Sequence, residues 1–157
     1  MSTDLILQIR STSSEATERL AQVIGSNLRG GEIIELQSDL GGGKTTFTRG
    51  LVAGSGSNDE VASPTFTISR VYQALHFSFH HFDFYRLQEA GIVTHELEEV
   101  INEPDSVVVV EWANIVATSL PKERVVHILF EYLGETERNI VISAPKDYMY
   151  LFDGVEK

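Results

Sequence analysis

The sequence contains no cysteine, which excludes disulfide bonds and thiolate metal ligands from this chain. A chain without disulfides suits a reducing compartment, so we expect a cytoplasmic protein. The sequence also lacks an apolar run long enough to span a membrane, and its first residues, MSTDLILQIR, lack the basic segment and apolar core of a signal peptide. We therefore expect neither a leader peptide nor a membrane partner.

Basic residues are scarce in this sequence. The 157 residues include 12 Lys and Arg against 23 Asp and Glu, which gives a formal net charge of -11. Proteins that bind bare nucleic acid depend mainly on Lys and Arg to neutralise phosphates. We therefore expect no DNA partner, and we expect any connection with RNA to run through another protein.

The length and composition are typical of one globular domain. A hydrophobic content of 42%, with both signs of charge mixed along the chain, is enough to build a core in a protein of this size. We predict a single α/β domain over residues 1–157. Its core extends from about residue 12 to residue 143, and a C-terminal tail covers 144–157.

The central motif is the stretch EIIELQSDLGGGKTT, residues 32–46. An apolar run suited to a buried strand leads into three glycines, a lysine and two threonines, and helical apolar spacing follows. This order is typical of a phosphate-binding loop, or P-loop, in which glycines let several backbone N–H groups face a triphosphate at the positive end of a helix dipole. The residues expected to bind nucleotide are Leu40, Gly41, Gly42, Gly43, Lys44, Thr45 and Thr46.

Two side chains of this loop have separate expected roles. Lys44 reaches the β- and γ-phosphates, and the Thr45 hydroxyl ligates Mg²⁺, so the loop predicts ATP and Mg²⁺ as cofactors. Ser38 occupies the position where the general pattern G-x-x-x-x-G-K-[ST] has glycine. If the backbone has a positive φ there, a glycine would be less strained than this serine.

Two acids follow apolar segments, Asp83 after HHF and Glu111 after VVVV. P-loop enzymes hold Mg²⁺ or orient water with an acid at the end of such a strand. The apolar parity changes near His80 and His81, so we expect either a β-bulge there or a strand buried on both faces. The all-apolar run over 107–110 suits a central strand that is covered on both faces.

The remaining spacing predicts the flanking elements. We expect an edge strand over 5–9 and a helix over 16–28, which begins at a capping box of Thr12 and Glu15 and stops at Gly30-Gly31. An amphipathic helix over 93–103 with a solvated acidic face and a short helix over 114–118 should follow the P-loop region. Strands 124–132 and 138–143 should form a hairpin around Gly134. Apolar residues over 148–152 predict a tail segment that docks on the body or on a partner.

The stretch Ser63-Pro64-Thr65-Phe66 has two interpretations. Pro64 holds the preceding residue extended, and the small hydroxyl side chains could bind nucleotide or Mg²⁺. A loop that enters a strand explains the same residues equally well.

Four separated motifs, SDLGGGKTTFTRGL, SPTFTISRVY, HFDFYRL and VVVVEW, resemble those of the TsaE (YjeE) family. Members are bacterial P-loop ATPases needed for threonylcarbamoyladenosine (t6A) in tRNA. The resemblance covers residues from about 12 to 143. It implies a single-domain P-loop NTPase with a central mixed β-sheet flanked by helices, an ATPase that is weak alone and acts with a TsaB–TsaD pair, and only indirect contact with tRNA.

The resemblance also implies roles for individual residues. Lys44 and Asp83 are the expected catalytic residues, Thr45 and Glu111 the metal ligands, Ser63 to Phe66 a switch-like loop, and His81, Tyr85, Arg86 and Trp112 further motif residues. The chain departs from the family at Ser38 and at Ala113-Asn114, where members often have another acid. These departures bear on nucleotide affinity and on partner contacts. The four motifs contain no obvious arginine finger.

Two other interpretations remain open. A small-molecule kinase can use the same Gly-Lys-Thr-Thr loop, although kinases usually have an Arg-rich lid and here the basic residues are scattered. A metal site formed by His76, His80, His81 and Asp83 is the third possibility, because strand alternation puts His76 and His80 on one face.

Overall fold

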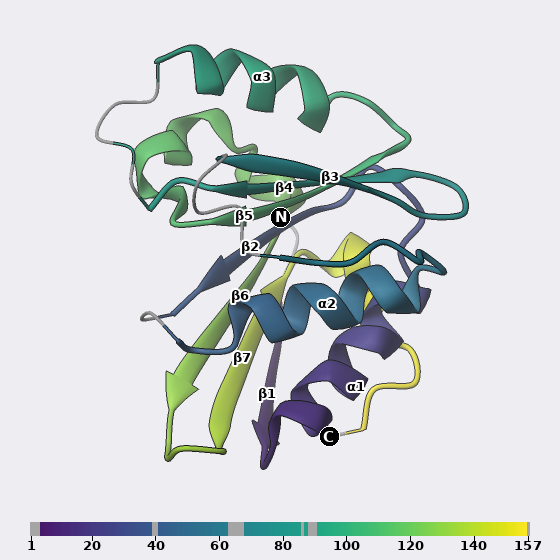
Figure 1. Ribbon diagram of the computed structural model, residues 1–157, viewed down its shortest axis with the longest axis vertical. Helices are drawn as coiled ribbons and strands as arrows, with labels where there is room; N and C mark the ends of the chain where they lie inside the picture. The colour runs from purple at the N-terminus through teal and green to yellow at the C-terminus, as the bar shows by residue number, and fades with distance from the viewer. Residues whose placement is uncertain (1–3, 39–40, 63–67, 86, 88–90, 157) are drawn as a thin grey trace.

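A computed structural model describes residues 4–38, 41–62, 68–85, 87 and 91–156. Within these residues the strands form a seven-stranded mixed sheet of order β1-β7-β6-β2-β5-β4-β3, with helices on both faces (Figure 1). The strands are β1 (Leu5–Ser11), β2 (Ile33–Gln37), β3 (Ser69–Gln73), β4 (Ser78–Asp83), β5 (Ser106–Glu111), β6 (Val125–Tyr132) and β7 (Arg138–Ala144). The helices are α1 (Ser14–Ser26), α2 (Lys44–Gly54) and α3 (Gly91–Ile101), with 3-10 helices η1 (Ala113–Ser119), η2 (Lys122–Arg124) and η3 (Lys146–Phe152).

The sheet has a parallel centre and antiparallel margins. Strands β6, β2, β5 and β4 run parallel, whereas β7 and β1 on one side and β3 on the other pair antiparallel. The carboxyl ends of parallel strands meet at one edge of a sheet. The P-loop follows β2 at that edge, and Asp83 and Glu111 end β4 and β5 there. The mixed sheet expected from the sequence is confirmed, as are the edge strand β1 and the β6–β7 hairpin.

Two apolar cores lie on opposite faces of the sheet. In β5, Val107 and Val109 pack in the core beneath α1 and α2, whereas Val108 and Val110 pack in the core beneath α3 and η1. All residues of β5 are buried. The prediction of a central strand covered on both faces is therefore confirmed.

Strand β4 resolves the change in apolar parity. It pairs residue by residue with β3 and with β5 from Ser78 to the strand end, so no bulge interrupts it. Phe79 packs in one core and Phe82 in the other. The alternative of a strand buried on both faces is correct, and the bulge is wrong. The strand begins at Ser78, and Leu75 lies in the preceding turn with 74% of its surface exposed.

The N-terminus of α1 differs from the predicted capping box. Ser13, in an extended conformation, is the N-cap, and its Oγ accepts a hydrogen bond of 3.0 Å from the Ala16 N–H. The box of Thr12 and Glu15 is wrong by one residue, because Ser13 satisfies the free amide by itself. Four serine or threonine residues in a row, Ser11 to Ser14, made both registers compatible with the sequence.

Residues 146–152 dock on the body of the protein. Leu151 is fully buried in the core beneath α1 and α2. The Tyr150 hydroxyl donates a hydrogen bond of 2.6 Å to the buried Glu32 carboxylate, and the Arg29 guanidinium lies 3.8 Å from the centroid of the Tyr150 ring. Of the two predicted destinations for this tail segment, the structure shows the body.

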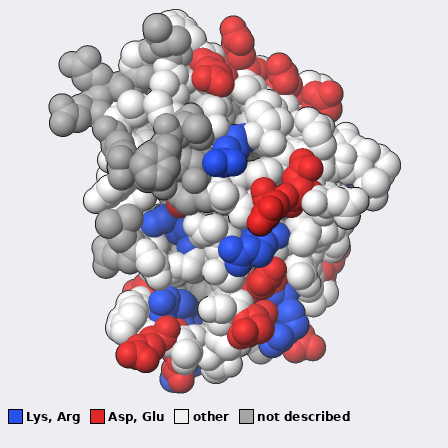
Figure 2. Space-filling view, in the orientation of Figure 1, with Lys and Arg blue, Asp and Glu red and all other residues white. Residues whose placement is uncertain are grey.

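The predicted acidic face of α3 is solvated. Glu96, Glu98, Glu99 and Glu103 are exposed, and Figure 2 shows acidic side chains along the top of the molecule, over α3. Leu97, on the opposite face of the helix, is fully buried. Among the described helices, none has the length and apolar character needed to cross a membrane.

Glycines bring α1 and α2 into close backbone contact. A Cβ at Gly50 would lie 2.4 Å from the Glu18 carbonyl oxygen and 2.6 Å from the Ala21 Cβ, and one at Gly25 would lie 2.2 Å from the Leu51 carbonyl oxygen. These distances are too short for any side chain. The crossing therefore fixes the position of α2, whose first residue is Lys44.

We predict that Gly50→Ala lowers the free energy of unfolding by about 1–3 kcal/mol, because the added methyl group forces the two helices apart despite the higher helix propensity of alanine. Urea denaturation measures this loss. Gly134→Ala is the control, since a Cβ at Gly134 meets nothing within 4 Å, and it should change stability by less than about 0.5 kcal/mol. Equal stability of the two variants would show that the helices can separate without cost.

Candidate functional site

The P-loop connects β2 to α2 through glycines with left-handed backbone. Gly41 has φ of 76°, and Gly43, the N-cap of α2, has φ of 104°. A Cβ at either position would meet nothing within 4 Å, so these positions need glycine for its dihedral freedom and not for space. The conformational reason for the glycines is confirmed at both positions. Thr45 and Thr46 follow in the first turn of α2, and Leu40 lies outside the described residues.

Lys44 is buried and held from two sides. Its Nζ donates to the Ser38 Oγ at 3.1 Å and to the Ser38 carbonyl oxygen at 3.3 Å, and it lies 4.5 Å from the centroid of the Trp112 ring. The described residues with a positive φ other than glycine do not include Ser38. Ser38 therefore lacks the positive φ at which a glycine would be less strained, and glycine would relieve no strain at this position. The serine hydroxyl instead supports the lysine.

The backbone of Trp112 has an unusual conformation directly after β5. Its φ and ψ are 57° and 52°, in the left-handed region that costs a non-glycine residue about 1–3 kcal/mol. The indole packs against Tyr85, with ring centroids 4.8 Å apart, and faces the Lys44 ammonium. Of the two predicted motif residues, Trp112 thus lies beside the P-loop lysine and Tyr85 lies against Trp112.

Asp83 and Glu111 end neighbouring parallel strands and are direct register partners. Both are buried, with 8% and 3% of their surfaces exposed. Burial raises the pKa of Asp83, and the Tyr85 N–H, which donates a 3.0 Å hydrogen bond to its Oδ1, opposes that rise. Both acids therefore lie at strand ends, as the sequence predicted, and the register places them side by side.

His81 holds the Glu111 carboxylate. The imidazole is completely buried, and its Nε2 lies 2.5 Å from the Glu111 Oε2. Its Nδ1 lies 3.5 Å from the Tyr72 hydroxyl, which donates a 2.9 Å hydrogen bond to the Ala62 carbonyl oxygen. These contacts run from Ala62 through Tyr72 and His81 to Glu111. They hold the carboxylate in place and give the polar atoms of this buried cluster hydrogen-bond partners.

The histidine metal site is wrong. Because β4 has no bulge, His80 and His81 point to opposite faces of the sheet, and His76 lies in the exposed turn before the strand. Burial lowers the pKa of His80, which faces the acidic residues of the α3 side. The described residues contain no group of three or more His, Cys, Asp or Glu that could hold a metal ion by themselves.

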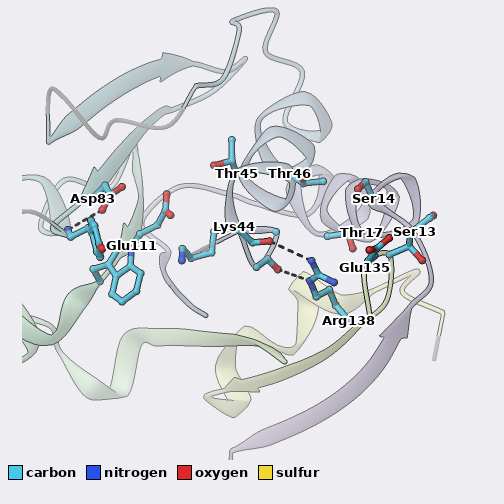
Figure 3. Close-up of a pocket in the computed structure, with 16 residues that line it drawn as sticks. Ser13, Ser14, Thr17, Lys44, Thr45, Thr46, Asp83, Glu111, Glu135 and Arg138 are labelled. Carbon is cyan, nitrogen blue, oxygen red and sulfur yellow. Dashed lines mark hydrogen bonds between the residues drawn. The ribbon is translucent and has the colours of Figure 1, made fainter. Parts of the chain in front are cut away.

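The P-loop, the two strand-end acids and Trp112 line one cavity of about 490 Å³. Figure 3 shows Asp83 and Glu111 at one end, Lys44 and Thr45 near the middle, and Arg138 with the start of α1 at the other end. The residues that sequence reasoning missed are Ser13, Ser14, Thr17, Glu135, Thr136 and Arg138. Their sequence signals indicate a helix start and a hairpin turn, and the sheet brings both to the P-loop. Arg86 and the stretch 63–66 lie outside the described residues.

The donor set fits a magnesium nucleotide. The Thr45 hydroxyl and the carboxylates of Asp83 and Glu111 supply oxygen atoms, which Mg²⁺ prefers, and Mg²⁺ commonly takes only one or two protein ligands beside phosphates and water. Backbone N–H groups and one lysine suit the phosphates themselves.

Comparisons with known proteins agree with this architecture. The family model described as "Threonylcarbamoyl adenosine biosynthesis protein TsaE" matches residues 11–140. The chain is 35% identical to the "tRNA threonylcarbamoyladenosine biosynthesis protein TsaE" of Bacillus subtilis over 138 residues, which covers 88% of this chain and 85% of the relative. It is 35% identical to the protein of the same description from Treponema pallidum, with 85% and 97% covered.

A solved structure is similar over nearly the whole chain. The crystal structure of YdiB from Bacillus subtilis superposes with a TM-score of 0.77 at 30% sequence identity, and the match covers 98% of this chain and 95% of that one. At this identity and coverage the two proteins share one fold.

We predict that His81→Leu lowers the free energy of unfolding by about 3–5 kcal/mol, because it leaves the buried Glu111 carboxylate without its partner. Urea denaturation at neutral pH measures the loss. His127→Leu is the matched control: His127 pairs with Glu35 at 3.1 Å, but its side chain is 49% exposed, so the expected loss is below about 1 kcal/mol. A loss at His81 no larger than that at His127 would contradict the supporting role of the buried pair.

Proposed function

Because this chain belongs to the TsaE family of tRNA threonylcarbamoyladenosine biosynthesis proteins, we propose that it binds ATP with Mg²⁺ and hydrolyses the nucleotide in support of that modification. The observation that carries the proposal is the single cavity that joins the P-loop, with its left-handed Gly41 and Gly43, to two buried acids at strand ends. Each half of this arrangement suits one part of a metal–nucleotide complex.

The P-loop half holds the phosphates. Backbone N–H groups of the loop and the first turn of α2 bind the phosphate oxygens at the positive end of the helix dipole. Lys44, which Ser38 and Trp112 hold in place, carries the positive charge that binds the β- and γ-phosphates. In this proposal the stretch 63–66, which lies outside the described residues, serves as the family's switch-like loop.

The strand-end half holds the metal and the water. Thr45 and Glu111 are the proposed Mg²⁺ ligands, and the ion supplies charge neutralisation on the phosphates when it is bound. His81 fixes the orientation of the Glu111 carboxylate, as the hydrogen-bond partners of metal ligands do in many metal sites. Asp83, anchored through Oδ1 to the Tyr85 N–H, orients the attacking water or completes the outer shell of the metal.

Hydrolysis by this chain alone is slow in our proposal, and a TsaB–TsaD pair accelerates it. Arg49 is exposed on α2, and Arg138 is engaged by carbonyl oxygens of the chain, so neither is aimed at a phosphate as an arginine finger. With a net charge of -11, a protein partner suits this surface better than tRNA itself. In this proposal the protein acts in the cytoplasm, where ATP and the tRNA to be modified are found.

Nucleotide binding is tested at the lysine. Lys44→Ala should weaken ATP binding by roughly tenfold or more, because charge-assisted hydrogen bonds of this kind are worth about 1.5–3 kcal/mol. Calorimetry with Mg²⁺ present measures the affinity. Arg49→Ala, which removes the same charge from an exposed position of the same helix, should bind ATP as the unaltered protein does. Equal affinity of the Lys44 variant would refute the assignment of the loop.

The partner requirement is tested by phosphate release with each component added singly and together. We expect slow release by the isolated chain, stimulation by TsaB with TsaD, and no stimulation by tRNA alone, because an arginine supplied in trans can be worth about 10³–10⁵ in rate. The Lys44→Ala variant gives the background rate. Fast release by the isolated chain would favour an independent ATPase, and stimulation by a small phosphate acceptor would favour the small-molecule kinase.

A further inference from the structure

Arg138, the first residue of β7, reaches across to the P-loop. Its Nε donates to the Gly42 carbonyl oxygen at 3.2 Å, and its Nη2 donates to the Gly41 carbonyl oxygen at 3.3 Å. Figure 3 draws both bonds and shows Lys44, Glu111 and Asp83 on the other side of the loop. Gly42 and Gly41 are 96 and 97 positions away from Arg138 in the sequence. A link of this kind ties the loop to the opposite half of the sheet.

The hairpin turn holds the guanidinium in this position. Nη1 donates to the Gly134 carbonyl oxygen at 2.6 Å and to the Glu137 carbonyl oxygen at 2.8 Å, and the guanidinium carbon lies 5.0 Å from the centroid of the Tyr132 ring. A planar fork with five donors can meet all four carbonyl groups at once, which a lysine ammonium cannot do in the same geometry. The turn therefore aims the side chain before any ligand arrives.

Holding a carbonyl group also fixes the amide on the other side of the same peptide. The C=O and N–H of a trans peptide point in opposite directions, and the described chain contains no cis peptide. When Arg138 holds the carbonyl groups of Gly41 and Gly42, the N–H groups of Gly42 and Gly43 must point away from the arginine. Within the described backbone, neither amide donates to a carbonyl in a turn, loop or cap.

We propose that Arg138 is a positioning residue of the nucleotide site, which orients two P-loop N–H groups toward the phosphates by holding the carbonyl groups behind them. This inference rests on the proposed function in taking the ligand to be a nucleotide. The arginine acts on the loop and does not touch the phosphates. Preorganised donors bind an anion without a further loss of conformational entropy to order them.

The experiment compares Arg138→Gln, Arg138→Lys and Arg10→Gln by calorimetry with ATP and with ADP. Arg10 is the control, because it lies on the neighbouring strand β1 and pairs with Glu137 of the same hairpin, but it is not among the residues that line the cavity. We expect both Arg138 variants to lose roughly tenfold in affinity for both nucleotides. We expect Arg10→Gln to lose less than about twofold, as is usual for an exposed pair.

Two results would overturn the positioning role. Full rescue by Arg138→Lys would show that only the charge matters, and an unchanged affinity with a reduced turnover rate would show that the arginine acts on the transition state. If the unaltered protein binds neither nucleotide, the proposed function itself fails, so the two failures are distinguishable.

A readout without nucleotide tests the loop directly. NMR order parameters of the Gly42 and Gly43 backbone amides should be lower in Arg138→Gln than in the unaltered protein or in Arg10→Gln, because the carbonyl groups behind these amides are released. An unchanged melting temperature of the Arg138 variant would confine the effect to the loop. Equal order parameters in all three proteins would refute the proposal even if nucleotide affinity fell.

Discussion

The in-register parallel pairing of β2, β5 and β4 is the constraint on which the site depends. Leu36 of β2 is the register partner of Glu111, and Glu111 is the register partner of Asp83. A shift of one residue in either pair would turn an acid to the other face of the sheet and place an apolar side chain where a carboxylate now lies. The two apolar cores, one on each face, enforce the register because every residue of β5 is buried.

The same buried residues serve stability and chemistry. A buried polar pair such as His81–Glu111 stabilises a protein little more than apolar residues of similar size would. The main contribution of this pair is therefore the orientation of the Glu111 carboxylate. Trp112 also carries a cost, in its left-handed backbone, and turns its indole toward Lys44. Local cost at the end of β5 is offset by the packing of the rest of the strand.

The cavity joins chain segments that are distant in sequence. The glycine contacts between α1 and α2 fix the helix that begins at Lys44, and the hairpin between β6 and β7 places Arg138 behind the loop. The chain belongs to the TsaE family, and its P-loop is supported from three directions: by the helix crossing, by Trp112 at the end of β5 and by the hairpin. A substitution far from the loop can reach it through any of these supports.

The sequence by itself determined the elements and the local chemistry of the site. Apolar spacing predicted the sheet strands and helices, and the order of strand, glycines, lysine and threonine predicted the phosphate loop, because these signals depend on neighbours within one element. The parity change in β4 could not be resolved locally, since a bulge and a strand with two buried faces leave the same pattern. Pairing with β3 and β5 decided it.

Tertiary structure alone also decided that His81 supports Glu111, that Ser38 holds Lys44 without a positive φ, and that Arg138 reaches the P-loop. The reason is physical: each of these contacts joins atoms from different elements, and their distance is set by strand order, register and helix packing, which no short stretch of sequence contains.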